Sequence, residues 1–219
     1  MVCEGGEVSF VSRMIDESLQ LRNQVQWYTS MLGKFSSLSK VIEQLKENKV
    51  DNYAVTEFVQ GSKTRRWAVA WSFDDKRPSM TVSRGCGSLQ KSLLPFPAEQ
   101  TITINAHDKT AIATRLHGTL SGLIPIWSWE STLFTGIGFC DKAVWSRASR
   151  RHRSDTNDGN STPHSELLAK DMSFGFKISL ETLEAQADGS KVIVRWLKGH
   201  DSVLFESFCG MIKRKVQDI

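Results

Sequence analysis

The sequence predicts an α/β unit over residues 1–75, followed by a small α+β unit over residues 100–219. In the first unit, the apolar pattern gives the order helix, strand, helix, strand, turn, strand, which is typical of a mixed sheet covered by helices. In the second unit, alternating residues predict strands around a turn, and a helix closes the chain. Between them, residues 76–99 are polar and contain Gly, Ser and Pro, as a linker does.

The first three elements follow from apolar spacing. Apolar residues at intervals of three and four predict a helix over about Glu7–Leu21. The stretch Gln24–Leu32 is rich in aromatic and β-branched residues on both faces, which predicts a strand buried between helices. Ser36 and Ser37 offer caps for a second helix that ends near Asn48.

A β-hairpin is predicted over Asn52–Phe73, because two runs of alternating apolar residues flank a short connection that contains Gly61. The tip carries three cations, Lys63, Arg65 and Arg66. Three cations at one tip suit phosphate groups, and a solvated turn with solubility charges is the alternative interpretation. The hairpin would give the sheet one antiparallel strand at its edge.

Four ordered segments of the first unit carry a family resemblance. They are Cys3–Glu7, Gln26–Gly33, Thr56–Gly61 and Arg66–Phe73. Together they resemble the RNA adenine-N(6) methyltransferases that modify U6 small nuclear RNA, which have a bacterial relative acting on large-subunit ribosomal RNA. The resemblance implies that residues 1–75 form the C-terminal half of a class I Rossmann-like methyltransferase domain.

The same resemblance implies where the site lies. It implies that Gly5, Gly6 and Glu7 lie beside the active-site mouth, and that the basic hairpin grips RNA, with Arg66 the best-matched cation. From spacing alone, the glycines fit either a plain loop-to-helix turn or close backbone approach to a bound group.

The chain departs from the family in two motifs. It has neither the Asn-Pro-Pro-Phe motif that holds the target adenine nor a Gly-x-Gly loop after a strand ahead of Gly5. No catalytic and no cofactor-binding residue is therefore assigned. S-adenosylmethionine is the cofactor of the full-length family and is not expected to bind this chain alone. Met1 is expected to correspond to an internal methionine, as in a truncated product or an incomplete gene model.

The second unit begins with a strand over Gln100–Asn105 and a helix that Asp108 caps and that ends near Gly122. The stretch 123–140 has no clear period, and its Trp127 and Trp129 suit either the core, which is favoured, or RNA stacking.

Two strands, Ser173–Leu183 and Lys191–Lys198, are predicted around a turn at Asp188-Gly189. Asp201 or Ser202 then caps a closing helix.

Four arginines lie at roughly helical spacing near the middle of this unit. They are Arg147, Arg150, Arg151 and Arg153. This run suits RNA phosphates or a nuclear-import signal, with a solvated charge run as the alternative. A polar insert over about 146–171 is expected to be disordered. The unit resembles the C-terminal RNA-binding region of the same family, a kinase-associated-like domain.

Bulk composition narrows the choice of partner, metal content and cellular location. A net charge of +4 favours an anionic partner, and the four scattered cysteines support neither a zinc site nor a disulfide framework, so no metal is expected. No apolar tract is long enough to span a membrane, and no secretory signal opens the chain. We expect a nuclear protein, with the cytoplasm as a second location, whose partner is structured RNA of the U6 type. A non-catalytic RNA-binding or regulatory module is the alternative, and an inactive degenerate fragment is the third.

Overall fold

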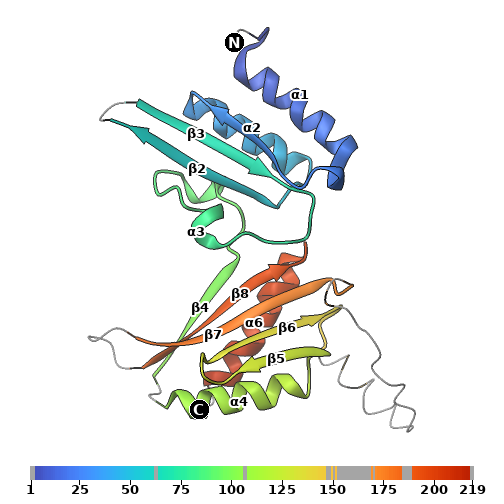
Figure 1. Cartoon of the computed structure of the whole chain (residues 1–219), viewed down its shortest axis with the longest axis vertical. Coiled ribbons are helices and arrows are strands. Elements are labelled where there is room, and N and C mark those ends of the chain that lie inside the picture. The colour runs from blue at the N-terminus through green and yellow to red at the C-terminus, as the bar shows by residue number, and fades with distance from the viewer. Residues whose placement is uncertain are drawn as a thin grey trace. The chain divides into compact units, whose positions relative to one another are not determined.

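The computed structural model describes residues 3–61, 64–105, 108–146, 149, 151, 169, 171–183 and 189–217, and Figure 1 traces them. The chain divides into two compact units, residues 1–97 and residues 98–219. Each unit has its own sheet.

The first unit has a three-stranded sheet and five helical segments. Its elements are α1 (Gly6–Leu21), the 3-10 turn η1 (Arg22–Gln24), β1 (Tyr28–Leu32), α2 (Phe35–Glu47), β2 (Tyr53–Gln60), β3 (Thr64–Trp71), α3 (Met80–Ser83) and the 3-10 turn η2 (Lys91–Leu93). The predicted helices and the hairpin are confirmed. Gly61 has a φ of 61° at the hairpin turn, a conformation that glycine adopts without steric cost.

The strand order of this sheet is β1-β3-β2, and β3 is antiparallel to both neighbours. The antiparallel strand therefore lies in the middle, whereas the sequence predicted it at the edge. Because β1 and β2 run the same way, their last residues meet on one side of the sheet, here named the carboxyl edge. Their first residues meet on the other side, named the amino edge. In α/β sheets, ligands bind outside the carboxyl ends of the strands.

One face of this sheet carries the core of the unit. Trp71 is fully buried, stacks on Tyr28 at 5.7 Å between ring centroids, and donates a hydrogen bond of 2.9 Å from its Nε1 to Ser18 Oγ on α1. The α2 residues Leu38 and Ile42 are also fully buried in this cluster. The tryptophan thus ties α1 to β3, and burying such a side chain contributes several kcal/mol.

The strand predicted over Gln24–Leu32 is shorter than expected. Only Tyr28–Leu32 is extended, and of these residues Tyr28 and Leu32 alone are buried, while Met31 is 64% exposed. The prediction of a strand buried on both faces is therefore wrong. Its apolar composition does not decide burial, because β1 lies at one side of the sheet order and only its alternate residues face the helices.

The stretch expected as a linker over 76–99 differs as well. Most of it packs on the first unit, because Cys86, Leu89 and Leu93 belong to the buried cluster of that unit. Ser88 Oγ also donates a 2.8 Å hydrogen bond to Glu57 Oε2 on β2. Three buried residues spaced through a polar segment have neither helical nor strand period, so the sequence pattern resembles a linker.

In the second unit, the described residues form an antiparallel five-stranded sheet and two long helices. Its elements are β4 (Glu99–Ile104), α4 (Lys109–Ser121), β5 (Ile126–Glu130), β6 (Thr135–Cys140), β7 (Phe174–Thr182), β8 (Ser190–Lys198) and α6 (Ser202–Gln217), with strand order β4-β8-β7-β6-β5. Asp108 Oδ1 accepts hydrogen bonds from the amides of Thr110 and Ala111, and Asp201 Oδ1 accepts one from Leu204, so both predicted caps are confirmed.

The stretch 123–140, without period in the sequence, contains the β5–β6 hairpin. Trp127 is half-buried and stacks on Phe176 at 6.0 Å, so it packs at the border of the core. A Cβ at Gly136 would lie 2.2 Å from Trp127 and one at Gly138 3.0 Å from it, so the indole fits only because β6 has glycine there. The predicted disordered insert lies, for the most part, outside the described residues.

Candidate nucleic-acid interface

A hollow of about 480 Å³ opens at the carboxyl edge of the first sheet. Its walls come from the start of α1, the turn between β1 and α2, and the start of β3. The lining residues are Gly5, Gly6, Glu7, Val8, Gly33, Lys34, Ser37 and Arg66. The structure thus brings together the three residues expected beside an active-site mouth and the best-matched cation of the hairpin. We name this feature the carboxyl-edge hollow.

Glu7 holds two walls of the carboxyl-edge hollow together. Its Oε2 accepts a hydrogen bond of 2.7 Å from the amide of Gly33, and its Oε1 accepts one of 3.1 Å from the amide of Lys34. These amides precede the first turn of α2, whose N-cap, Lys34, makes no side-chain cap. The predicted caps, Ser36 and Ser37, are therefore wrong: both lie inside α2, and Glu7 instead binds the amide of the N-cap residue and the amide before it.

The carboxylate of Glu7 is held ionised. Burial raises its pKa, but hydrogen bonds from Ser37, Gly33 and Lys34 favour the charged form and outweigh burial, so the pKa lies below its usual value. Its acceptor atoms are used inside the protein, so Glu7 serves the architecture of the hollow.

Both long helices of the unit begin at the carboxyl-edge hollow. The chain order α1, β1, α2 places the N-terminus of α1 and that of α2 at the same side of the sheet, where helix amides and dipoles favour negative charge. Gly5 and Gly6 have φ values of 77° and 71°, which glycine adopts readily. A Cβ at Gly6 would meet no atom within 4 Å, so the backbone is open to a bound group there.

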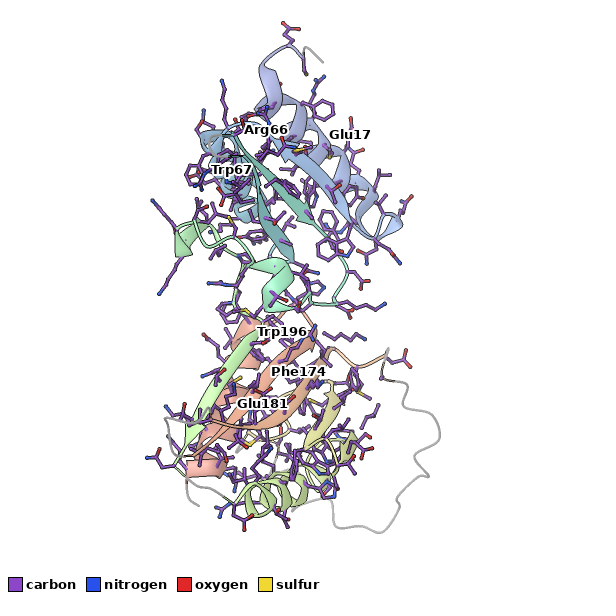
Figure 2. All side chains as sticks on the ribbon, turned by 60° about the vertical axis from the view of Figure 1, so that its left-hand side comes forward. Glu17, Arg66, Trp67, Phe174, Glu181 and Trp196 are labelled. Atoms are coloured by element: carbon purple, nitrogen blue, oxygen red, sulfur yellow. The ribbon has the colours of Figure 1, made fainter. Side chains whose placement is uncertain are left out.

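Arg66 is one of two cations, with Lys34, that line the carboxyl-edge hollow. It lies at the start of β3, next to Trp67 (Figure 2), and its side chain is exposed. A Cβ at Gly33 would lie 3.0 Å from Arg66 Nη1 and 3.3 Å from Glu7 Oε2, so the guanidinium rests against the β1–α2 turn. Helix amides and a planar guanidinium at one opening form a surface that suits phosphate oxygens.

Arg65, the neighbouring predicted RNA contact, lies on the other face of the hairpin, since consecutive strand residues alternate. Its Nη1 is 2.8 Å from Glu57 Oε1 in an ion pair. Hydrogen bonds from Ser88 and from Arg65 lower the pKa of Glu57. Arg65 does not line the carboxyl-edge hollow. The structure therefore separates two arginines that the sequence treated as one cluster.

The other predicted cations are only partly described. Lys63, Arg147, Arg150 and Arg153 lie outside the described residues, and Arg151 is exposed. A second basic opening lies in the second unit, where Trp145, Arg214 and Lys215 line a hollow of about 470 Å³. Trp145 lies two residues before Arg147, the first of the arginine run.

Four lining residues are not among the predicted site residues, namely Val8, Gly33, Lys34 and Ser37. A turn between a strand and a following helix at the carboxyl edge is the usual place for a ligand, and that rule was the available signal. Among the described residues, no group of three or more His, Cys, Asp or Glu could hold a metal ion, and none of the described helices is long and apolar enough to cross a membrane.

Residues 1–75 match a family model described as RNA methyltransferase. Over its whole length, the chain is 29% identical to the U6 small nuclear RNA (adenine-(43)-N(6))-methyltransferase of Schizosaccharomyces pombe, of which it covers 52%. It is also similar to the mouse RNA N(6)-adenosine-methyltransferase METTL16, with 49% identity over 144 residues. This match covers 66% of this chain and 26% of the mouse protein. The chain thus spans about half of the yeast relative and about a quarter of the mouse one.

Among solved structures, the chain is similar to the human METTL16 catalytic domain in complex with the MAT2A 3′UTR hairpin 1, with 48% identity and a TM-score of 0.34 over 36% of this chain and 28% of that one. It is also similar to the N-terminal domain of human METTL16 in complex with SAH, with 49% identity and a TM-score of 0.31 over 34% of this chain and 28% of that one.

Proposed function

Because residues 1–75 match the RNA methyltransferase family and the chain resembles its U6-type members, we propose that it functions in S-adenosylmethionine-dependent N(6) methylation of adenine in structured RNA. In this proposal, RNA of the U6 type or a similar hairpin is the substrate. The relatives named above carry N(6) methylation of adenine in RNA in their names, and the first unit has a three-stranded sheet packed against helices, which is compatible with a methyltransferase domain.

One observation carries the proposal, namely that Arg66 lies with Gly5, Gly6 and Glu7 in one hollow at the carboxyl edge. We assign Arg66 and the amides of the first turn of α1 to an RNA phosphate. Glu7 positions the β1–α2 turn against them. A rigid phosphate contact fixes the register of the RNA, which a base-modifying enzyme needs in order to present one adenine.

The carboxyl-edge hollow does not fit S-adenosylmethionine itself. Its single carboxylate, Glu7, already accepts from Gly33 and Lys34, so it is not available for a ribose. Its other charged groups, Lys34 and Arg66, are cations and would repel a sulfonium. The cofactor supplies the methyl group in this chemistry, and we assign none of the described residues to it.

We further propose that the second unit is a kinase-associated-like region that binds RNA in the nucleus. The arginine run after Trp145 and the cations Arg214 and Lys215 support this. Replacing Arg147, Arg150, Arg151 and Arg153 by Ala in the full chain should lower the slope of log affinity against log salt by about 2.8, since each phosphate contact on a single strand contributes about 0.7. An unchanged slope would refute this role.

The decisive test of the first unit compares two adjacent arginines. Arg66→Ala is expected to weaken binding of a U6-type hairpin RNA about fivefold to tenfold, because a charge-assisted phosphate contact is lost. Arg65→Ala removes the same charge from the opposite face and is the matched control, expected to change affinity less than twofold. Filter binding with the full chain measures both.

Equal losses in the two variants would mean that only overall charge matters, and the assigned contact would be refuted. Thermal melts of both variants check that the hairpin folds, since surface substitutions of this kind change stability by only about 0.5 kcal/mol.

A further inference from the structure

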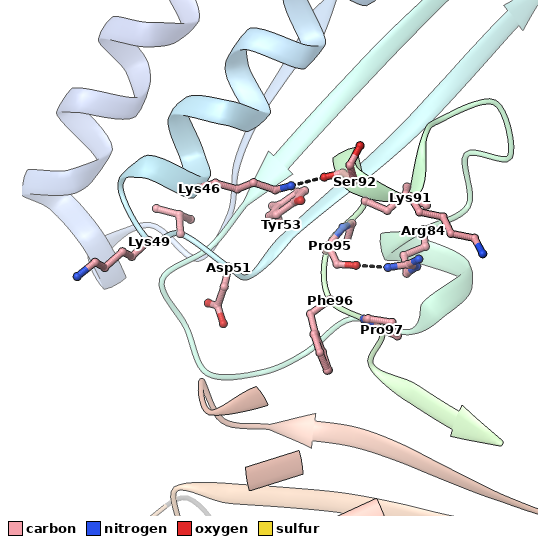
Figure 3. Close-up of a pocket in the computed structure, with 12 residues that line it drawn as sticks. Lys46, Lys49, Asp51, Tyr53, Arg84, Lys91, Ser92, Pro95, Phe96 and Pro97 are labelled. Carbon is pink, nitrogen blue, oxygen red and sulfur yellow. Dashed lines mark hydrogen bonds between the residues drawn. The ribbon is translucent and has the colours of Figure 1, made fainter. Parts of the chain in front are cut away.

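A second hollow, of about 530 Å³, lies at the amino edge of the first unit (Figure 3). It is formed by the end of α2, the start of β2, and the wall segment 84–97 that follows α3. It shares no lining residue with the carboxyl-edge hollow. We name it the amino-edge hollow, and the activity proposed above leaves it without a role.

The charge of the amino-edge hollow is strongly one-sided. Four cations line it, Lys46, Lys49, Arg84 and Lys91, against one carboxylate, Asp51. Asp51 is already in an ion pair, with Oδ2 2.6 Å from Nη2 of the buried Arg77. The hollow is therefore suited to an anion.

The four cations divide into two pairs. Lys46 donates to the carbonyl of Ser92 and Arg84 to that of Pro95, and both bonds hold the wall segment in place (Figure 3). Lys49 and Lys91 lie on opposite sides of the hollow, and their side chains extend outward from it (Figure 3). Neither side chain has a hydrogen bond or ion pair with the described residues. Two such cations on either side suit two separate anionic groups.

The surface between the two lysines is apolar. Val50, Tyr53, Leu94, Pro95 and Phe96 line it. The phenol of Tyr53 donates a 3.2 Å hydrogen bond to the carbonyl of Leu93, and burial raises its pKa to about 12, so it stays neutral and supports this wall from within the core. Leu94 and Phe96 are only half-buried, and an accessible aromatic ring such as that of Phe96 can accept the face of a nucleobase.

Lys49 itself occupies an unusual position. It has a φ of 58° just after α2, and the amide of Val50 donates a 2.8 Å bond to the carbonyl of Leu45, which is the helix-ending arrangement that normally carries glycine at the left-handed residue. A lysine there costs about 1 kcal/mol of backbone strain. Strain of this kind is found at functional positions, and here it places a cation at the rim.

We propose that the amino-edge hollow binds one nucleotide of a single-stranded RNA segment. The base lies against the half-buried side chains of Leu94 and Phe96, and phosphates of the same RNA segment lie at Lys49 and Lys91. The volume is within the range of small-molecule sites. This inference rests on the proposed function for RNA as the partner, but it concerns a different edge of the sheet and a different form of RNA.

The test uses the full chain and a fluorescein-labelled octauridine in a salt series. The double variant Lys49→Gly with Lys91→Ala should weaken binding about tenfold and lower the salt slope by about 1.4, for two lost contacts. The matched control, Lys40→Ala with Lys142→Ala, removes two exposed charges elsewhere and should retain the affinity. If the two double variants behave alike, the proposal fails.

Two further measurements locate the contact and identify the ligand. Photo-crosslinking of 4-thiouridine in the octamer should label a peptide that contains residues 91–97, and labelling confined to other peptides would overturn the assignment. Adenosine 5′-monophosphate and inorganic phosphate, at equal phosphate concentration, should each displace the octamer poorly, because neither spans both lysines. Full displacement by either would refute a bound strand.

The same probe separates this inference from the proposed function. Arg66→Ala should leave octauridine binding unchanged while it weakens the hairpin. Arg66→Ala could leave hairpin affinity unchanged while the double lysine variant still binds octauridine more weakly. In that case the phosphate contact assigned to the carboxyl-edge hollow is refuted, and the nucleotide site at the amino edge stands.

Discussion

The two edges of the first sheet carry hollows of similar size but different construction. At the carboxyl edge, backbone amides, three glycines and Arg66 surround an ionised Glu7 that accepts hydrogen bonds from within the protein. At the amino edge, four cations surround an apolar wall that ends in prolines. Fixed backbone dipoles therefore form much of the carboxyl-edge hollow, whereas charged side chains provide the cations of the amino-edge hollow.

This difference indicates which edge of the sheet can hold a bound RNA in one register. Amides at helix ends cannot move without unfolding a helix, so a phosphate at the carboxyl edge is held in one place. Lysines are flexible point charges and tolerate many positions of an anion. We therefore expect the carboxyl edge to position a structured RNA and the amino edge to retain a strand.

The largest expected effect is one that both edges share. Trp71→Ala removes the fully buried indole, its stack on Tyr28 and its bond to Ser18, and should lower the free energy of unfolding by about 4 kcal/mol. Binding of hairpin and octamer should fall together. Urea unfolding followed by near-UV circular dichroism measures the stability, and Val82→Ala, at a position 61% exposed, is the control. If Trp71→Ala lost binding to only one of the two RNAs, the two edges would not depend on a shared core.

The next effect separates the edges. Glu7→Gln should cost about 1–2 kcal/mol, because the amides of Gly33 and Lys34 lose a charged acceptor. Since folding lowers the pKa of Glu7, its contribution is present above about pH 4.5, the usual pKa, and is lost as the pH falls through the lower folded value.

The stabilities of the wild-type chain and of Glu7→Gln should therefore converge as the pH falls from about 4.5 through the lowered folded pKa of Glu7. The exposed Glu4→Gln is the control. A stability difference that stays constant between pH 3 and pH 7 would mean that Glu7 is not held ionised. Glu7→Gln should leave octauridine binding unchanged at neutral pH.

A smaller effect tests the glycines of the carboxyl edge. Gly6→Ala should cost about 1 kcal/mol, because φ is 71° and an L-residue is strained there, although a Cβ meets no atom. Gly87→Ala is the control, since Gly87 is equally open and lies outside the left-handed region. Thermal melts give the stability, and hairpin affinity should fall only for Gly6→Ala. An equal, negligible effect at both positions would show that the conformation of Gly6 is not needed.

The smallest effect has the opposite sign. Lys49→Gly should raise stability by about 0.5–1 kcal/mol, because glycine relieves the left-handed strain after α2. Lys49→Ala removes the same charge but keeps the strain, and should give no gain. Denaturant midpoints of the two variants separate backbone from charge, and a gain in Lys49→Ala would assign the effect to charge repulsion instead.

The sequence by itself determined the local elements. The alternation of Trp67, Val69 and Trp71 predicts the hairpin strand, and Asp108 predicts a helix start that its bonds to Thr110 and Ala111 confirm. The methyltransferase resemblance also came from short segments of the sequence, and residues 1–75 match that family. Such features depend on neighbours in the chain, where backbone geometry fixes which side chains share a face.

Tertiary structure alone decided how distant segments meet. Glu7 reaches the amide of Gly33 across 26 residues, Arg65 and Arg66 separate to two faces, and Leu93 joins a core that its polar surroundings conceal. Burial of β1 was predicted wrongly for the same reason, since composition does not show which strand lies at the side of a sheet. Contacts of this kind depend on which faces dock, and periodicity along the chain carries no information about the docking partner.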